Sequence, residues 1–196
     1  MSEHYYTEKP TSAHDERQVA VRALGGDLRF ITDAGVFSRD GLDRGTEVLQ
    51  NALPPLSGRV LDLGCGWGAV GVALGKQYPA LEIVMTDINR RAVELARRNL
   101  AQNGVQAEVV QGDGFASVTG AFDAILTNPP IRAGKAVIYG LFADARAHLK
   151  PGGALYIVIR KQQGAPSALK YLREIYAEAE VIDRSGGFHV IRARVD

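Results

Sequence analysis

The sequence predicts one α/β domain, a largely parallel sheet covered by helices on both faces, and three observations support this. From residue 59 onward, short runs rich in Val, Ile and Leu alternate with longer segments of helical period. Several of these runs are continuously apolar, which is typical of parallel strands buried on both faces. With 196 residues, of which 46% are hydrophobic and 23% charged, the chain suits a single domain with a sizeable core.

The expected elements follow one another in a regular order. Strands are predicted at 59–64, 82–87, 107–113, 122–127 and 154–159, and helices at 68–78, 90–102, 135–149 and 166–178. Asn89 can cap the second of these helices and Gly104 follows its end. Pro151, Gly152 and Gly153 then separate the third helix from the last of these strands.

The two ends of the chain differ from this pattern. Segments 179–185 and 188–195 flank Gly186-Gly187, a connection too short for a crossover helix, so we expect a terminal antiparallel hairpin on a five-stranded parallel sheet. Residues 1–50 are less regular, with loop-like aromatic stretches and a weakly helical 46–53. We therefore predict that residues 1–53 form a cap or lid on a domain spanning 54–196.

A glycine-rich turn follows the first predicted strand, in "VLDLGCGWGAVG" (60–71). Gly66, Gly68 and Gly71 match G-x-G-x-x-G, whose glycines allow a tight turn and close approach of the backbone to a nucleotide. Asp62 stands in the strand just before the turn, where its carboxylate would repel a pyrophosphate but attract an ammonium or a sulfonium group. The motif therefore favours a positively charged nucleoside over NAD.

Two more acids end the next strands. Asp87 lies 23 residues beyond Gly64, where a carboxylate can accept hydrogen bonds from ribose hydroxyls, and Asp113 can accept from an adenine amino group. Each also has a purely structural interpretation, Asp87 as a helix cap in competition with Asn89 and Asp113 as a turn former. A glycine turn among three carboxylates fits S-adenosylmethionine as the cofactor.

With "MTDIN", "QGDGF" and "LTNPP", these motifs resemble class I S-adenosylmethionine-dependent methyltransferases over nearly the whole chain. The resemblance implies a Rossmann-like seven-stranded mixed sheet of order 3-2-1-4-5-7-6, in which the last-numbered strand is antiparallel. The cofactor-binding residues that we expect on this basis are Asp62, Gly64, Cys65, Gly66, Gly68, Asp87, Ile88, Asp113, Gly114 and Asn128.

A narrower resemblance points to the substrate. "GVFSRDGLDRGTEVL" (35–49) and Asn-Pro-Pro resemble the RsmC-like methyltransferases of guanine N2 in small-subunit ribosomal RNA, while "HYYTEKP" and "RKQQGAPSALKYL" (160–172) resemble the single-domain YbxB-like branch. This implies an RNA or ribosomal-subunit partner. The sequence departs from this family in two ways. One half of the two-part RsmC architecture is present, and Ile131 follows Asn-Pro-Pro where amino-methylating relatives commonly have an aromatic ring that Phe37 or Tyr139 would have to replace.

Asn-Pro-Pro, at 128–130, is the expected catalytic motif. An exocyclic amine is a poor nucleophile because its lone pair is delocalised into the ring. The Asn128 side-chain oxygen and the Pro129 carbonyl can accept its two hydrogens, and the rings of Pro129 and Pro130 fix the backbone that presents these acceptors. The simpler interpretation is that two prolines end a strand.

The expected substrate contacts surround this motif. The net charge of +1 neither favours nor excludes a nucleic acid, but Lys and Arg are concentrated after Asn-Pro-Pro, and from 145 to 173 there is no Asp or Glu. A solvated helix face or ordinary packing accounts for such residues equally well. The candidate substrate-binding residues are Phe37, Arg39, Ile131, Arg132, Lys135, Arg160 and Lys161.

Other function classes are weighed by what the sequence lacks. One cysteine, Cys65, without zinc spacing indicates a reducing cytoplasm and no metal, and the histidines (4, 14, 148 and 189) are assigned no chemistry. We find no signal peptide and no long uncharged apolar run, so we expect neither export nor insertion into a membrane. The alternatives are methylation of adenine N6 or of a protein glutamine, and a non-catalytic RNA-binding or ribosome-assembly protein. An NAD-linked oxidoreductase is disfavoured by Asp62 and Asn-Pro-Pro.

Overall fold

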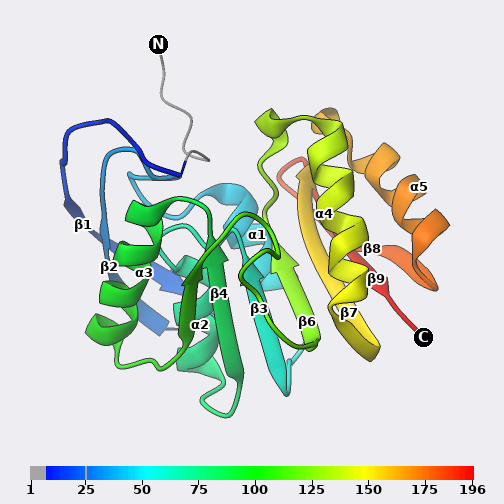
Figure 1. The fold of residues 1–196 in the computed structure, drawn as a ribbon, viewed down its shortest axis with the longest axis horizontal. Helices are drawn as coiled ribbons and strands as arrows, with labels where there is room; N and C mark the ends of the chain where they lie inside the picture. Colours follow the sequence, from blue (N-terminus) through cyan, green and yellow to red (C-terminus); the bar gives the residue numbers. More distant parts are fainter. Residues whose placement is uncertain (1–7, 25) are drawn as a thin grey trace.

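A seven-stranded sheet forms the central layer of the computed structural model, which describes residues 8–24 and 26–196 (Figure 1). Its spatial order is β5-β4-β3-β6-β7-β9-β8; β3 to β7 run parallel and β9 is antiparallel to both of its neighbours. This confirms the predicted 3-2-1-4-5-7-6 order. The strands are β3 (Arg59–Leu63), β4 (Glu82–Asp87), β5 (Glu108–Gln111), β6 (Phe122–Thr127), β7 (Leu149–Arg160), β8 (Glu178–Ser185) and β9 (Phe188–Arg194).

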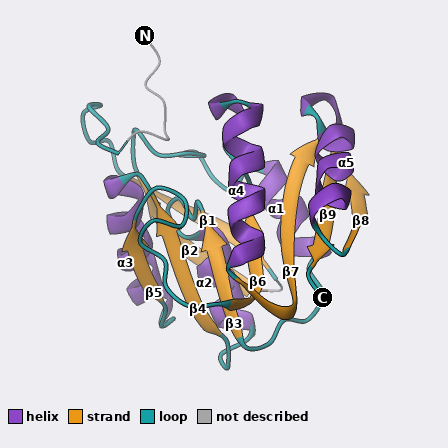
Figure 2. Ribbon diagram, turned by 45° about the vertical axis from the view of Figure 1, so that its right-hand side comes forward, coloured by secondary structure: helices purple, strands orange, loops and turns teal. Residues whose placement is uncertain are grey.

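Helices cover the sheet on both faces (Figure 2). Strand β3 shows why, because its side chains alternate between two buried clusters. Val60 packs with α1, α2 and α3, whereas Leu61 and Leu63 pack with α4 and α5. The helices are α1 (Arg44–Ala52), α2 (Ala69–Gln77), α3 (Arg90–Asn103), α4 (Lys135–Ala147) and α5 (Ala165–Ile175), with short 3-10 turns η1 (Ile131–Ala133) and η2 (Lys161–Gln163). Within the described residues, no helix is both long and apolar enough to cross a membrane.

Most predicted boundaries agree with the structure to within a few residues, and the largest differences have local causes. Strand β7 begins at Leu149 rather than at 154, because Leu149 already pairs with Phe122 before an irregular stretch, after which regular pairing starts at Ala154. Helix α5 ends at Ile175 rather than at 178, because the chain then turns into β8, with the Ala177 N–H donating to the Arg194 carbonyl at 3.0 Å.

A second, two-stranded sheet in the N-terminal segment was not predicted. Strands β1 (Arg17–Ala23) and β2 (Gly26–Thr32) form an antiparallel hairpin that lies against α2 and α3, so the expectation of irregular structure was wrong over these residues. The Phe30 ring lies 4.8 Å, centroid to centroid, from the ring of Trp67. Much of the "HYYTEKP" motif at 4–10 lies outside the described residues.

The Asn99 side chain of α3 binds the outer edge of β2. Its Oδ1 accepts from the Ile31 N–H at 2.7 Å, and its Nδ2 donates to the Ile31 carbonyl at 2.9 Å and to the Trp67 carbonyl at 2.8 Å. The amide thus takes the place of another strand and joins the hairpin to the glycine turn.

The weakly helical segment 46–53 corresponds to α1. Asp43 caps this helix, since its two carboxylate oxygens accept from the N–H groups of Gly45 at 3.1 Å and Thr46 at 2.8 Å. Helix α1 packs against β7 and β9. The loop of residues 33–43, which we call the 33–43 loop, therefore runs from the hairpin to a helix start held at the sheet.

Candidate functional site

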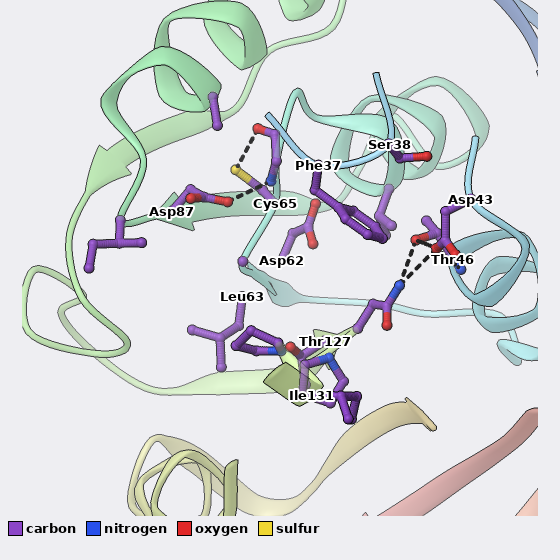
Figure 3. A pocket seen from close by; sticks show the side chains of 18 of the residues that line it. Phe37, Ser38, Asp43, Thr46, Asp62, Leu63, Cys65, Asp87, Thr127 and Ile131 are labelled. Atoms are coloured by element: carbon purple, nitrogen blue, oxygen red, sulfur yellow. Dashed lines mark hydrogen bonds between the residues drawn. The ribbon is translucent and has the colours of Figure 1, made fainter. Parts of the chain in front are cut away.

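A cavity of about 570 Å³ opens at the carboxyl ends of the parallel strands (Figure 3). Open α/β sheets bind ligands at this edge, where the strand order reverses. Its walls come from the ends of β3, β4 and β6, the glycine turn, the 33–43 loop, the 112–114 turn and η1. The volume is that of a pocket for a nucleoside-sized ligand.

The glycine turn forms one wall of this cavity. The N–H groups of Gly64 and Cys65 both donate to the Thr86 carbonyl of β4, at 2.8 and 2.9 Å, which holds the turn across two strands. Gly64 and Gly66 have positive φ angles of 75° and 54°, and a Cβ at either would meet no atom within 4 Å, so their backbone faces open space.

Gly68 has a different position from the other predicted cofactor-binding glycines. It lies outside the cavity lining at the start of α2, and a Cβ there would come within 3.3 Å of the Ala96 backbone of α3. The missing side chain therefore serves the packing of α2 against α3.

Asp62 is a buried carboxyl in the cavity wall, 3% exposed. Its Oδ2 accepts from the Gly71 N–H at 3.0 Å. Burial, with the nearby Asp87 charge adding to it, raises the pKa of Asp62 to about 7. The group is therefore poised to ionise when a cation enters the cavity.

Asp87 ends β4 at the other side of the glycine turn. One carboxylate oxygen accepts from the Gly66 N–H and the other from the Asn89 N–H, both at 2.8 Å. Burial raises the pKa of Asp87. Helix α3 is capped by Asn89, whose Oδ1 accepts from the Arg91 and Ala92 N–H groups. Since Asn89 does the capping, Asp87 holds the glycine turn.

The structure brings the other predicted cofactor residues to the same cavity. Asp113 is exposed in the turn after β5, and Ile88 follows Asp87 at the end of β4. The predicted cofactor-binding residues in the lining are Asp62, Gly64, Cys65, Gly66, Asp87, Ile88, Asp113, Gly114 and Asn128. Their place agrees with a cofactor site, and their binding role stays a prediction.

Asn128 begins the Asn-Pro-Pro segment directly after β6. Its Nδ2 donates to Asp43 Oδ2 at 2.8 Å and to Thr46 Oγ1 at 3.1 Å, the bonds drawn beside Asp43 and Thr46 in Figure 3. No group among the described residues donates to its Oδ1. Pro129 and Pro130 also line the cavity. The segment thus offers a fixed amide with one unused acceptor.

The predicted substrate contacts divide into two groups. Phe37, Ile131, Arg132 and Arg160 line the cavity. The other three lie outside the lining. Arg39 bonds to the Asp15 carboxylate, the Lys135 ammonium lies 5.0 Å from the centroid of the Tyr139 ring, and Lys161 begins η2.

Tyr139, the alternative ring for base stacking, lies outside the cavity lining. Its ring stacks on Tyr171, with 4.3 Å between centroids. Phe37, by contrast, is 37% exposed and lines the cavity. Of the two rings considered from the sequence, Phe37 is the one at the site.

Several lining residues were not among the predicted site residues. Asp43 stands before α1 and contacts Asn128, which follows it by 85 residues. The sequence signals that Asp43 is a helix cap, but a contact over this separation has no local signal. The Trp67 indole N–H donates to the carbonyls of Phe37 at 3.0 Å and Ser38 at 3.3 Å, and so ties the 33–43 loop to the glycine turn.

Comparison with known proteins gives one family. The model of the methyltransferase small domain matches residues 27–192. The chain is 42% identical to the uncharacterized protein YbxB of Bacillus subtilis (strain 168), over 99% of both chains. It is 40% identical to ribosomal RNA small subunit methyltransferase C of Pasteurella multocida (strain Pm70), over 86% of this chain and 49% of that protein.

Solved structures agree with this result. The T. thermophilus 16S rRNA N2 methyltransferase RsmC, in complex with AdoMet and guanosine, matches with a TM-score of 0.84 and 26% identity over 95% of this chain and 52% of that one. A methyltransferase from Pyrococcus furiosus matches with a TM-score of 0.66 at 20% identity over 75% of this chain and 79% of that one, which shows the fold alone. The chain thus spans about half the length of the RsmC proteins that it matches.

Proposed function

This chain belongs to the methyltransferase small domain family, and from that premise we propose that it transfers the methyl group of S-adenosylmethionine to the N2 amino group of a guanine in small-subunit ribosomal RNA. One observation carries the proposal. A single cavity contains both a glycine turn flanked by carboxylates and an Asn-Pro-Pro segment with an unused amide oxygen. A charged nucleoside cofactor and an amino group can meet there.

The carboxylates are assigned to the cofactor. Asp87 accepts hydrogen bonds from the ribose hydroxyls, and Asp113 from the adenine amino group. Asp62, once ionised, attracts the methionine ammonium and the sulfonium. Gly64, Cys65, Gly66, Ile88 and Gly114 form the remaining walls around the cofactor.

The Asn-Pro-Pro segment is assigned to the target amine. Asn128 Oδ1 and the Pro129 carbonyl accept its two hydrogens, which favours a pyramidal nitrogen with its lone pair directed at the methyl group. The nitrogen forms a bond to the methyl carbon while the carbon–sulfur bond breaks and sulfur keeps the electron pair. The amine becomes acidic only as this bond forms, so it then loses a proton to water without a strong base.

The RNA is assigned to the rim of the cavity. A base within a duplex is hard to reach, so the target is unpaired or flipped out. Phe37 and Ile131 offer it apolar surface, and Arg132 and Arg160 contact phosphates at the cavity, with Arg39, Lys135 and Lys161 beyond it. In this proposal residues 1–53 act as a cap on the 54–196 methyltransferase domain. RNA of this kind and the lone Cys65 fit a cytoplasmic enzyme.

The likeness to the T. thermophilus RsmC, an N2 methyltransferase of 16S rRNA, supports guanine N2 as the target. The chain spans about half the length of the RsmC proteins that it matches. The test is transfer of tritiated methyl groups to ribosomal subunits, naked ribosomal RNA and protein fractions, followed by nucleoside analysis. We expect N2-methylguanosine. Label on adenine or on protein glutamine would replace the proposed substrate, and binding of RNA without transfer would indicate a non-catalytic protein.

For the catalytic motif, we expect Asn128→Ala to bind S-adenosylmethionine normally, by isothermal titration, and to lose about 10²–10³-fold in single-turnover rate, because it removes a preorganised acceptor. Asn51→Ala, an exposed change in α1, is the matched control and should leave the rate intact. Full activity in Asn128→Ala would contradict the role given to Asn128.

A further inference from the structure

We propose that Asp43, together with Thr46, is a positioning residue for methyl transfer, which holds the Asn128 amide in the one orientation that presents its oxygen to the target amine. The inference rests on the proposed function, because it assigns Asn128 Oδ1 the task of accepting an amine hydrogen. Asp43 itself need not touch the substrate. It acts through Asn128.

The geometry is a closed set of hydrogen bonds around one carboxylate oxygen. Asp43 Oδ2 accepts from Asn128 Nδ2 at 2.8 Å, from the Thr46 hydroxyl at 2.7 Å and from the Thr46 N–H at 2.8 Å. The Thr46 hydroxyl, having donated its proton to Asp43, accepts from Asn128 Nδ2 at 3.1 Å. Asn128 Nδ2 therefore donates to two oxygens that are themselves joined by a hydrogen bond.

The charge of Asp43 decides which way the amide faces. An ionised carboxylate can only accept hydrogen bonds, so the amide must turn its nitrogen and not its oxygen toward Asp43. The alternative amide orientation would place two acceptors, Asn128 Oδ1 and Asp43 Oδ2, against each other with no hydrogen between them. Asn128 Oδ1 is thus held on the side away from Asp43, as an acceptor without a donor among the described residues.

The same contact strengthens this acceptor. A carboxylate bonded to an amide N–H draws the amide toward its charge-separated resonance form, and this raises the negative charge on the amide oxygen. An oxygen of greater charge stabilises the partial positive charge that develops on the amine hydrogens during transfer.

The backbone at the start of α1 is shaped for this contact. Gly45 lies between Asp43 and Thr46, and a Cβ there would come within 2.9 Å of the Phe188 ring and 3.4 Å of Asn128 Nδ2. A side chain at 45 would therefore press on the Phe188 ring of β9 and displace the start of α1, which carries Asp43 and Thr46. The absence of a side chain lets Asp43 and Thr46 reach Asn128 together.

The test separates positioning from helix capping. Asp43→Asn and Asp43→Ser both keep a good N-cap residue while removing the charge. We expect both variants to melt within a few degrees of the parent and to bind S-adenosylmethionine unchanged. Their kcat should fall about 10–100-fold with little change in KM for RNA, on the scale of other orienting partners. Asp40→Asn, an equal charge change at a side chain that is 82% exposed, should leave kcat intact.

A double-mutant cycle then asks whether Asp43 acts through Asn128. In the Asn128→Ala background, Asp43→Asn should lower the rate no further, because the group that it orients is gone. Independent, multiplying losses would overturn the proposal. So would a change in KM alone, or normal kcat in both Asp43 variants.

A measurement without RNA keeps this inference distinct from the proposed function. In ¹⁵N-labelled protein, the Asn128 side-chain amide protons should be shifted downfield by the carboxylate and move upfield in Asp43→Asn but not in Asp40→Asn. If this shift is present but no RNA is methylated, the proposed function fails while the orientation of Asn128 stands. If RNA is methylated and the chemical shifts of the Asn128 side-chain amide protons do not change in Asp43→Asn, the positioning role fails.

Discussion

Asp62 shows how one residue can couple binding to protonation. Asp62 is 3% exposed, and its carboxylate accepts a hydrogen bond from the Gly71 N–H. Burial is the main reason that its pKa rises from 3.8 to about 7. Between these values the folded chain keeps a proton that the unfolded chain has lost, so this group lowers stability as the pH rises from about 4 to about 7.

Cofactor binding should show the opposite trend with pH. If the cofactor requires ionised Asp62, its affinity should rise about tenfold from pH 6 to pH 8, because the ionised fraction rises by that factor around a pKa of 7. Isothermal titration in buffers of different ionisation heat should also detect release of a proton at pH 6. Asp62→Asn should bind more weakly and lose this pH dependence; an unchanged profile in the variant would exclude Asp62 as its source.

At the scale of elements, the β1–β2 hairpin is held by side chains of α3 and not by the main sheet. Asn99 is fully buried and bonds to both backbone groups of Ile31 and to the carbonyl of Trp67. Helix α3 therefore supports both the hairpin and the glycine turn.

Removing this amide should loosen the hairpin. We expect Asn99→Ala to lower the free energy of unfolding by about 2–4 kcal/mol, because it leaves buried backbone groups without partners. Urea denaturation measures the loss, and hydrogen exchange should show it first in β1 and β2. Asn51→Ala in α1, which is exposed, should change stability by no more than about 0.5 kcal/mol. Equal effects of the two changes would contradict the role of Asn99.

The sequence predicted some elements and missed others for physical reasons. The buried strands were found because parallel strands covered on both faces are continuously apolar, as in "RVLDL" (59–63). In the hairpin, buried and less buried residues alternate instead, and Val21, Ala23, Leu28 and Phe30 are buried. The aromatic loops around the hairpin obscured this signal of period two. The contact between Asp43 and Asn128 depends on tertiary packing, so no window of sequence contains it.

At the scale of the whole molecule, charge is distributed unevenly about the cavity. On the α3 side, Arg90 and Arg98 pair with carboxylates of Glu94 and Glu16. On the α4 side, Arg132 and Lys135 have no carboxylate partner among the described residues. A net charge of +1 thus includes two cations without carboxylate partners on this side, as the proposed phosphate contacts require.

Salt dependence of RNA binding should locate this face. We expect Arg132→Ala and Lys135→Ala each to weaken binding and to reduce the slope of log Kobs against log salt by about 1, since each removes one phosphate contact. Filter binding across a salt series gives both the binding constant and its dependence on salt. Arg22→Ala, an exposed change in β1, is the control and should leave the slope unchanged, because β1 lies at the left of Figure 1, away from α4 on the right. A slope that responds equally to all three changes would argue against a localised face.

The bond from Trp67 to the 33–43 loop has a practical consequence. Trp67 is the only tryptophan of the chain, it is 3% exposed, and its indole N–H is shared between the carbonyls of Phe37 and Ser38 at the cavity. Indole emission is sensitive to the hydrogen bonding and polarity around that N–H. The protein therefore carries a single built-in fluorescent probe, without labelling, at the junction of the 33–43 loop and the glycine turn in the cavity wall.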